Sequence, residues 1–170
     1  GYRVLGVGVT EFTGNDFPGE QQEFRFVFKG VVAFYDPPKD NIGPVLQSFY
    51  DAGISVKIIT GDNAATTATI AKQIGFKGAE HTISGEVLVS EKETKLEEDV
   101  MQINIFTRMF PEAKLRIINA LKAKGQIVAM TGDGVNDGPA LKAAHIGIAM
   151  GKKGSEIARQ ASSLSPFFPW

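Results

Sequence analysis

The sequence predicts an α/β fold in which a parallel sheet is covered by helices on both faces. Two observations carry this prediction. Short apolar segments of strand type alternate with helical segments from residue 42 to residue 161, and the connections between them are short. The chain is 43% hydrophobic and 22% charged, which is the composition of an ordinary globular protein, and 170 residues suffice to bury a core.

The N-terminal region precedes this alternation and has a different character. Residues 2–9 are rich in Val and Gly and read as a strand, and residues 13–23 contain the Gly, Asn, Asp and Pro of a loop. Residues 24–34 are apolar or alternate, so they predict one or two further strands. The segment Asp36-Pro37-Pro38 ends them, because proline cannot continue a central ladder.

The alternating region begins with a helix whose apolar residues Ile42, Val45, Leu46 and Phe49 share one face, and which ends near Gly53. Glycine also closes the next helix, and a proline opens the one at residue 111. The remaining expected elements, in chain order, are a strand at 55–59, a helix at 64–74, an exposed acidic helix or loop around 90–100, a strand at 103–107, a helix at 111–124, a strand at 126–130, a helix at 139–144, a strand at 146–150 and a helix at 155–161.

Charge and residue content exclude several classes of function. A net charge of -1 gives no reason to expect nucleic acid or an anionic membrane as a partner. The absence of cysteine excludes disulfides and thiolate chemistry. The longest apolar runs are far too short to cross a bilayer, so we expect no membrane insertion by these residues.

The segment from Met130 to Leu141 holds two carboxylates four residues apart, Asp133 and Asp137, among glycines that let the backbone approach a ligand. Asp133 directly follows a predicted strand, and in parallel sheets ligands bind at the carboxyl ends of strands. Carboxylates are ligands that Mg²⁺ prefers, often together with phosphate oxygens. The alternative is that both acids are loop and capping residues, with Asp137 capping the next helix.

A second Thr-Gly-Asp triplet, Thr60-Gly61-Asp62, also follows a predicted strand and precedes a helix N-terminus. A hydroxyl and an unshielded amide in this position readily receive phosphate oxygens. When the triplet is taken alone, an ordinary turn with Asp62 or Asn63 as the N-cap is the better explanation.

Two cations, Lys114 and Arg108, lie close to the predicted helix start at residue 111. A lysine is unfavourable near a helix N-terminus because the dipole is positive there, which suggests that the ammonium is used elsewhere, for instance on a phosphoryl group. A solvated surface lysine is the alternative. The acidic run at residues 91–99 is expected to be a solvated face, and His81 and His145 lack metal-ligand spacing.

Taken together, residues 36–39 (Asp-Pro-Pro-Lys), residues 60–63 (Thr-Gly-Asp-Asn), Lys114 and residues 130–141 resemble the P-type cation-transporting ATPases. The resemblance covers residues 24–161 in a fixed order. It implies a phosphorylation domain of the haloacid dehalogenase-like class, which is a Rossmann-like α/β fold. The Asp-Pro-Pro and Met-Thr-Gly-Asp-Gly-Val-Asn-Asp forms resemble those of the calcium, sodium-potassium and proton pump branches, and among these branches we prefer a calcium-type pump.

The resemblance implies a role for each residue at the phosphate. In the family, the ATP γ-phosphate moves to an aspartate of an Asp-Lys-Thr-Gly-Thr motif and is then hydrolysed. Asp133 would be the Mg²⁺ ligand, Asp137 the acid that orders the site, and Asn136 a member of the same hydrogen-bond network. Thr60 and Gly61 would bind phosphoryl oxygens.

Further roles follow for residues around this centre. Lys114 would offset the charge of the transferring group. Asp62 and Arg108 would lie toward the nucleotide, and Asp36 would help at the hinge to a nucleotide-binding domain. Mg²⁺ would be the cofactor, and ATP the substrate of the parent pump.

One departure from the family is serious: no Asp-Lys-Thr-Gly-Thr sequence occurs in this chain. We therefore expect a soluble fragment of a larger pump, lying on the cytoplasmic side of a membrane in the parent and inactive by itself. Residues 1–23 would end the nucleotide-binding domain and its connecting loop, residues 24–161 would form the C-terminal part of the phosphorylation-domain core, and residues 162–170 would be a disordered or non-native tail.

The expected partners are the remainder of the pump: the nucleotide-binding domain, the segment with the nucleophile, and the membrane helices. Two alternatives stay open. The first is a free-standing haloacid dehalogenase-like phosphatase with Asp36 or Asp16 as its nucleophile. The second is a non-catalytic module that binds magnesium or phosphate.

Overall fold

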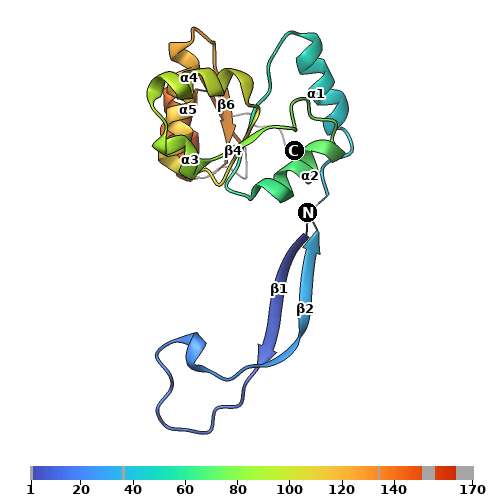
Figure 1. The fold of residues 1–170 in the computed structure, drawn as a ribbon, viewed down its shortest axis with the longest axis vertical. Coiled ribbons are helices and arrows are strands. Elements are labelled where there is room, and N and C mark those ends of the chain that lie inside the picture. The colour runs from blue at the N-terminus through green and yellow to red at the C-terminus, as the bar shows by residue number, and fades with distance from the viewer. Residues whose placement is uncertain (1, 36, 134, 151–155, 164–170) are drawn as a thin grey trace. The chain divides into compact units, whose positions relative to one another are not determined.

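The computed structural model describes residues 2–35, 37–133, 135–150 and 156–163. The chain divides into two compact units, Gly1–Lys39 and Asp40–Trp170, called here the hairpin unit and the α/β unit. Figure 1 follows the chain through both of them.

The hairpin unit is an antiparallel pair of strands, β1 (Tyr2–Val9) and β2 (Val27–Tyr35). The register places Tyr2 opposite Tyr35 and Val9 opposite Val27, with an irregularity after Val7. The loop between the strands contains the short 3-10 helix η1 (Gln21–Glu23). The strand predicted at residues 2–9 is therefore confirmed, and the second strand starts at Val27 rather than at residue 24.

The α/β unit alternates strands and helices as predicted, although the strand predicted at 126–130 lies at residues 129–132. Its described strands are β3 (Ile58–Ile59), β4 (Thr82–Ser84), β5 (Ile105–Thr107), β6 (Ala129–Gly132) and β7 (Ile146–Ala149). Its described helices are α1 (Ile42–Asp51), α2 (Ala64–Gln73), α3 (Gly85–Ser90), α4 (Glu93–Gln102), α5 (Pro111–Ala123), the 3-10 helix η2 (Val135–Asp137), α6 (Gly138–Ala143) and α7 (Glu156–Ala161).

The strands of the α/β unit form two parallel half-sheets. In the first, β5 lies between β3 and β4, and in the second, β6 pairs with β7. Among the described residues, no backbone hydrogen bond joins β3 to β6. Each of these strands therefore has a partner on one side only within its half-sheet, which the periodicity of the sequence did not predict.

Helices cover both faces of the β5 half-sheet. Successive residues of a strand point to opposite faces, so neighbouring residues of β5 lie in different cores. Phe106 lies in a larger core that includes buried residues of α4 and α5 and also Met130 of β6. Its neighbour Ile105 lies in a smaller core with Leu46 of α1 and Ala71 of α2. The predicted α/β fold with helices on both faces is confirmed.

The acidic stretch is more buried than its composition predicts. Within it, Leu96 and Val100 of α4 are fully buried, and the side chain of Glu91 is only 10% exposed. Burial, followed by the charge of Asp99, raises the pKa of the Glu91 carboxyl. The expectation of a fully solvated face was wrong, because α4 packs one apolar side against α5. Strand β4, which precedes this stretch, was also missed.

A single guanidinium fixes the position of α5 against α3. Arg116 of α5 donates through Nη1 to the backbone oxygens of Leu88 and Val89, at 3.1 and 2.8 Å. Its Nη2 donates to the backbone oxygen of Glu91 at 3.1 Å and to Glu93 Oε1 at 2.7 Å. These acceptors include the last carbonyls of α3, which have no partner within the helix itself.

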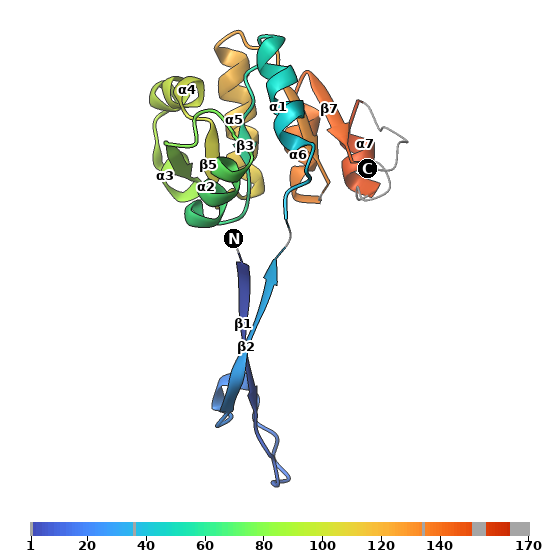
Figure 2. The ribbon, with the colours of Figure 1, turned by 90° about the vertical axis from the view of Figure 1, so that its right-hand side faces the viewer.

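The C-terminal elements gather around the second half-sheet. Figure 2 shows α6, β7 and α7 side by side, and the three elements contact one another. The backbone N–H of Ser163 donates to the carbonyl of Gly147 in β7 at 2.9 Å, whereas residues 164–170 of the predicted tail lie outside the described residues. No helix in the described part of the chain has the length and apolar content needed to span a bilayer.

Candidate functional site

The first Thr-Gly-Asp loop (residues 60–63) leads from β3 into α2. Asn63 is the N-cap of α2, and its side-chain oxygen accepts a hydrogen bond from the N–H of Thr66 at 3.0 Å. The hydroxyl of Thr60 accepts from the N–H of Asp62 at 3.1 Å, which closes a tight turn. Asn63, and not Asp62, is therefore the N-cap of α2. Asp62 is exposed to solvent.

The first loop is held by the segment that follows β5. Arg108 donates its backbone N–H to the carbonyl of Asp62, and Met109 donates to that of Thr60, both at 2.9 Å. Arg108 has φ 50°, a left-handed conformation that is costly for a residue with a side chain. Gly85 makes room for this segment, since a Cβ there would lie 2.6 Å from the Arg108 carbonyl oxygen.

The second loop (residues 131–137) leads from β6 through η2 into α6. Asp133, directly after the strand, is exposed, whereas Asp137 is buried to 8% exposure. Asp137 Oδ1 accepts from Lys114 Nζ at 2.6 Å, and the two side chains are 12% and 11% exposed. Asp137 occupies the N-cap position of α6 but makes no side-chain capping bond, so the capping alternative was wrong for this residue.

Gly132 is what allows Asp137 to turn inward. A Cβ on Gly132 would lie 2.7 Å from Asp137 Cβ and 2.8 Å from its Oδ2, closer than real side chains approach. Any larger residue at position 132 would displace the carboxylate from Lys114. The spacing of Gly132 and Asp137 within the loop is therefore a packing requirement.

Residues 108–114 connect the two loops. At one end, Arg108 and Met109 hold the first loop by backbone hydrogen bonds. At the other, Lys114 in the first turn of α5 reaches Asp137 of the second loop. Lys114 lies at the unfavourable end of the helix dipole, and the buried carboxylate offsets that disadvantage. A lysine carries three donor protons, so the ion pair leaves capacity for further acceptors.

The fit of this site to Mg²⁺ depends on how many carboxylates it offers. Among the described residues, no three His, Cys, Asp or Glu side chains are grouped so that they could hold a metal ion. Asp137 is engaged by Lys114, which leaves Asp133 as the carboxylate that faces solvent in this loop. One carboxylate suits a Mg²⁺ ion that keeps waters and phosphate oxygens, but it does not by itself build a resident metal site.

The remaining predicted site residues are exposed, lie in the hairpin unit or lie outside the described residues. Asn136 lies exposed in η2, and Arg108 is exposed beside the first loop. Asp36, predicted at a hinge, lies outside the described residues. Asp16, the other candidate nucleophile, lies in the loop of the hairpin unit. The roles of Gly85 and Gly132 were missed, because each depends on contact with a residue whose position the sequence pattern does not specify.

Comparison with known proteins gives one family and a set of longer relatives. A family model of "haloacid dehalogenase-like hydrolase" matches residues 8–145. "Probable cation-transporting ATPase F" of Mycobacterium bovis is 40% identical over 171 residues, which is 96% of this chain and 19% of that protein.

Two eukaryotic relatives agree with this comparison. "Calcium-transporting ATPase 1" of Saccharomyces cerevisiae is 36% identical, over 96% of this chain and 18% of that protein. "Calcium-transporting ATPase type 2C member 2" of Homo sapiens is 43% identical, over 82% of this chain and 15% of that protein. The chain therefore spans less than a fifth of the length of these relatives.

Proposed function

Because the chain belongs to the haloacid dehalogenase-like hydrolase family, we propose that its α/β unit is part of the phosphoryl-transfer site of an ATP-driven cation pump of the calcium-transporting branch. The observation that carries the proposal is the link between the two Thr-Gly-Asp loops through residues 108–114. The names of the longer relatives, which include calcium-transporting ATPases, support the choice of branch.

In this proposal, the chain's own residues bind and orient the phosphoryl group. The hydroxyl of Thr60 and the amide of Gly61 would receive phosphoryl oxygens next to the N-terminus of α2. Lys114 would use the protons not taken by Asp137 to offset the negative charge that the group carries during transfer. Asn136 would join the hydrogen bonds at the second loop. Catalysis of phosphoryl transfer rests largely on such positioning and electrostatics.

Residues at the edges of the site have supporting roles in the proposal. Asp133 would supply one carboxylate to Mg²⁺, which neutralises charge on the phosphate oxygens when it is bound. Asp62 and Arg108, both exposed, would face the nucleotide. Asp36 would lie at the hinge toward a nucleotide-binding domain that residues 1–23 would complete. Residues 24–161 would form the C-terminal part of the phosphorylation domain, followed by a tail at 162–170.

The acceptor of the phosphoryl group has to come from a segment with an Asp-Lys-Thr-Gly-Thr motif, which this chain lacks. The acceptor carboxylate would attack phosphorus, the bond to the ADP oxygen would break, and an acyl phosphate would form. The edges of β3 and β6 that face away from their half-sheets offer backbone groups with which such a segment could pair. The remaining partners would be the membrane helices of the pump, with this chain on the cytoplasmic side.

The test compares the chain with a version extended at its N-terminus by an apolar strand, an Asp-Lys-Thr-Gly-Thr motif and a flexible linker. Both are incubated with labelled ATP and Mg²⁺, and acid-stable, hydroxylamine-sensitive phosphate is measured. We expect label only on the extended version, and only at the aspartate of the motif. Changing that aspartate to asparagine should remove the label, because covalent catalysis then has no acceptor.

Two variants connect the label to the proposed residues. Lys114→Met should reduce labelling about 100-fold, as expected when one charge-stabilising group is lost. Lys124→Met, at the exposed C-terminal end of the same helix, is the matched control and should label normally. Turnover of p-nitrophenyl phosphate by the unextended chain, abolished by Asp36→Asn or Asp16→Asn, would instead establish a free-standing phosphatase.

A further inference from the structure

We propose that the junction between α3 and α4 is a clasp that closes on a proton shared by the carboxyl groups of Glu91 and Asp99. Glu91 is the C-cap of α3 and Lys92 is the N-cap of α4, so the two helices meet at these residues. The clasp belongs to the α/β unit and involves none of the residues assigned to the phosphate. It makes the attachment of α4 to its neighbours depend on pH.

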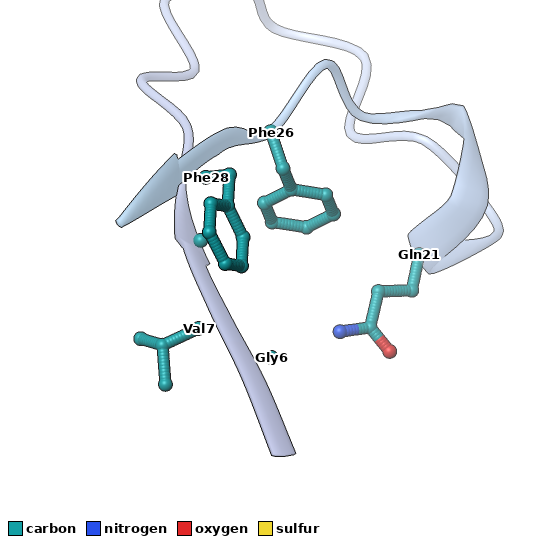
Figure 3. A pocket seen from close by; sticks show the side chains of 6 residues that line it. Gly6, Val7, Gln21, Phe26 and Phe28 are labelled. Atoms are coloured by element: carbon teal, nitrogen blue, oxygen red, sulfur yellow. The ribbon is translucent and has the colours of Figure 1, made fainter. Parts of the chain in front are cut away.

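The groups of the clasp are covered by the chain's own helices, unlike the rings of the hairpin unit. There, Gly6, Phe26 and Phe28 line a hollow of about 420 Å³ (Figure 3), and Phe28 is 69% exposed. Nothing in the structure shows what covers these rings. At the α3–α4 junction, in contrast, the side chain of Glu91 is 10% exposed and that of Asp99 is 18% exposed.

One oxygen of Glu91 is buried without a hydrogen-bond partner. Among the buried side-chain nitrogen and oxygen atoms of the described residues, Glu91 Oε2 is the one that has no partner. The backbone holds this residue in place, because its N–H donates to the Leu88 carbonyl at 3.3 Å and its carbonyl accepts from Arg116 Nη2 at 3.1 Å. A carboxylate held there loses water at Oε2 and gains no donor in exchange, which favours the neutral carboxyl.

The nearby cation is committed to the other carboxylate. Lys95 Nζ donates to Asp99 Oδ2 at 2.6 Å, whereas it lies 3.6 Å from Glu91 Oε1, beyond hydrogen-bond distance. Asp99 is close enough to accept a hydrogen bond from a protonated Glu91. Burial and then the charge of Asp99 raise the pKa of the Glu91 carboxyl, and Lys95 acts in the opposite direction. With the proton in place, one ammonium faces one carboxylate and one neutral acid.

The charged groups of the packed helices are engaged elsewhere. The guanidinium of Arg116 on α5 donates to backbone oxygens at the end of α3 and to Glu93 Oε1 at 2.7 Å. Glu86 of α3 lies in the first turn of that helix, at the end away from Glu91. A second negative charge at Glu91 would therefore have to share one ammonium with Asp99.

Loss of the proton opens the clasp, because two carboxylates then compete for one ammonium and Oε2 requires water. Turning Glu91 outward releases the start of α4, a helix that packs Leu96 and Val100 against α5. The pKa of Glu91 is higher in the folded chain than in the unfolded one. The stabilisation is therefore complete below the pKa of an ordinary glutamate and is lost as the pH rises through the raised value.

The first experiment follows the proton directly by NMR. The full 170-residue chain is labelled with ¹³C, its glutamate side chains are assigned through the backbone, and their carboxyl resonances are recorded from about pH 4 to about pH 8. We expect Glu91 to titrate at a higher pH than the exposed Glu86 and Glu98. Asp99→Asn should lower the midpoint of Glu91, because it removes the neighbouring charge. A Glu91 midpoint equal to those of Glu86 and Glu98 would overturn the proposal.

The second experiment tests whether the proton controls α4. Glu91→Gln places an amide beside Asp99 that donates at every pH. Hydrogen–deuterium exchange of the peptide at residues 88–102, corrected for the intrinsic pH dependence of exchange, measures local opening. We expect the unchanged chain to open about fivefold more than Glu91→Gln at about pH 8, and equally at about pH 4.5.

Glu98→Gln removes an exposed acid from the same helix and is the matched control, which should follow the unchanged chain at both pH values. The same pH dependence of opening in Glu91→Gln and in the unchanged chain would contradict the clasp. A pH-dependent change of equal size in the peptides of α2 would assign the effect to the stability of the whole unit and also overturn it. The NMR midpoint is measured on the unchanged chain, so it decides the proposal even if Glu91→Gln folds poorly.

Discussion

The first loop and the second loop begin with the same Thr-Gly-Asp triplet, and they differ in what holds them. The first is held by backbone hydrogen bonds to Arg108 and Met109, and its Asp62 stays exposed. The second is held by the buried ion pair of Asp137 with Lys114. Identical triplets can therefore be fixed in two ways, one that leaves side chains facing outward and one that depends on a charge pair inside the protein.

The middle residue of each triplet reflects this difference. A Cβ on Gly61 would meet its nearest neighbour, the Met109 carbonyl oxygen, at 3.9 Å, which is an ordinary contact. A Cβ on Gly132 would lie 2.7 Å from Asp137 Cβ. Position 61 thus has room for a Cβ, whereas glycine at position 132 makes space for a buried carboxylate.

The largest expected effect is on the ion pair. Lys114→Met should lower the free energy of unfolding by about 3 kcal/mol, because it removes the cation that is paired with the largely buried carboxylate of Asp137. Urea denaturation followed by circular dichroism measures the change. Lys124→Met is the control and should change stability by less than about 0.5 kcal/mol. A loss below about 1 kcal/mol for Lys114→Met would mean that the second loop does not depend on the pair.

A pair of alanine substitutions tests the two glycines directly. Gly132→Ala should cost about 2 kcal/mol, since the added methyl group displaces Asp137. Gly61→Ala, at the same place in the other triplet, should stay within about 0.5 kcal/mol. Both are measured by urea denaturation. Equal costs at the two positions would remove the distinction between the loops.

A smaller effect is expected at the N-cap of α2. Asn63→Ala should cost about 1 kcal/mol, because the N–H of Thr66 loses its acceptor. Asn63→Asp keeps an acceptor oxygen and should retain most of the stability. Thermal unfolding of the three proteins distinguishes them, and an Asp variant as unstable as the Ala variant would show that capping is not what Asn63 contributes.

The smallest effect concerns the residue that joins the loops. Arg108→Gly should raise the free energy of unfolding by about 0.5 kcal/mol, since glycine adopts a φ of 50° without strain but loses more backbone entropy on folding. Arg108→Ala keeps the strain and should give no such gain. If Ala stabilises as much as Gly, the backbone conformation is not the cause.

Much of the fold followed from local pattern. The helices at 42–51, 64–73 and 111–123 lie where apolar spacing, glycine and proline predict them. The elements that were missed or shortened, β4 and β3, have only three and two residues, too few for a strand pattern to stand out. The separation into two half-sheets also lay beyond the pattern, because periodicity describes single segments and not their pairing.

The sequence by itself determined the residue types of the site: two Thr-Gly-Asp triplets at the carboxyl ends of strands, and a lysine in the first turn of a helix. Only the tertiary structure decided which acid is buried, because that depends on Lys114 and Asp137, 23 positions apart, meeting at 2.6 Å. It also decided that Gly132 and Gly85 are required, since the atoms that exclude a side chain there come from Asp137 and Arg108. Local chemistry is encoded residue by residue, whereas burial and close contact arise only when distant segments pack together.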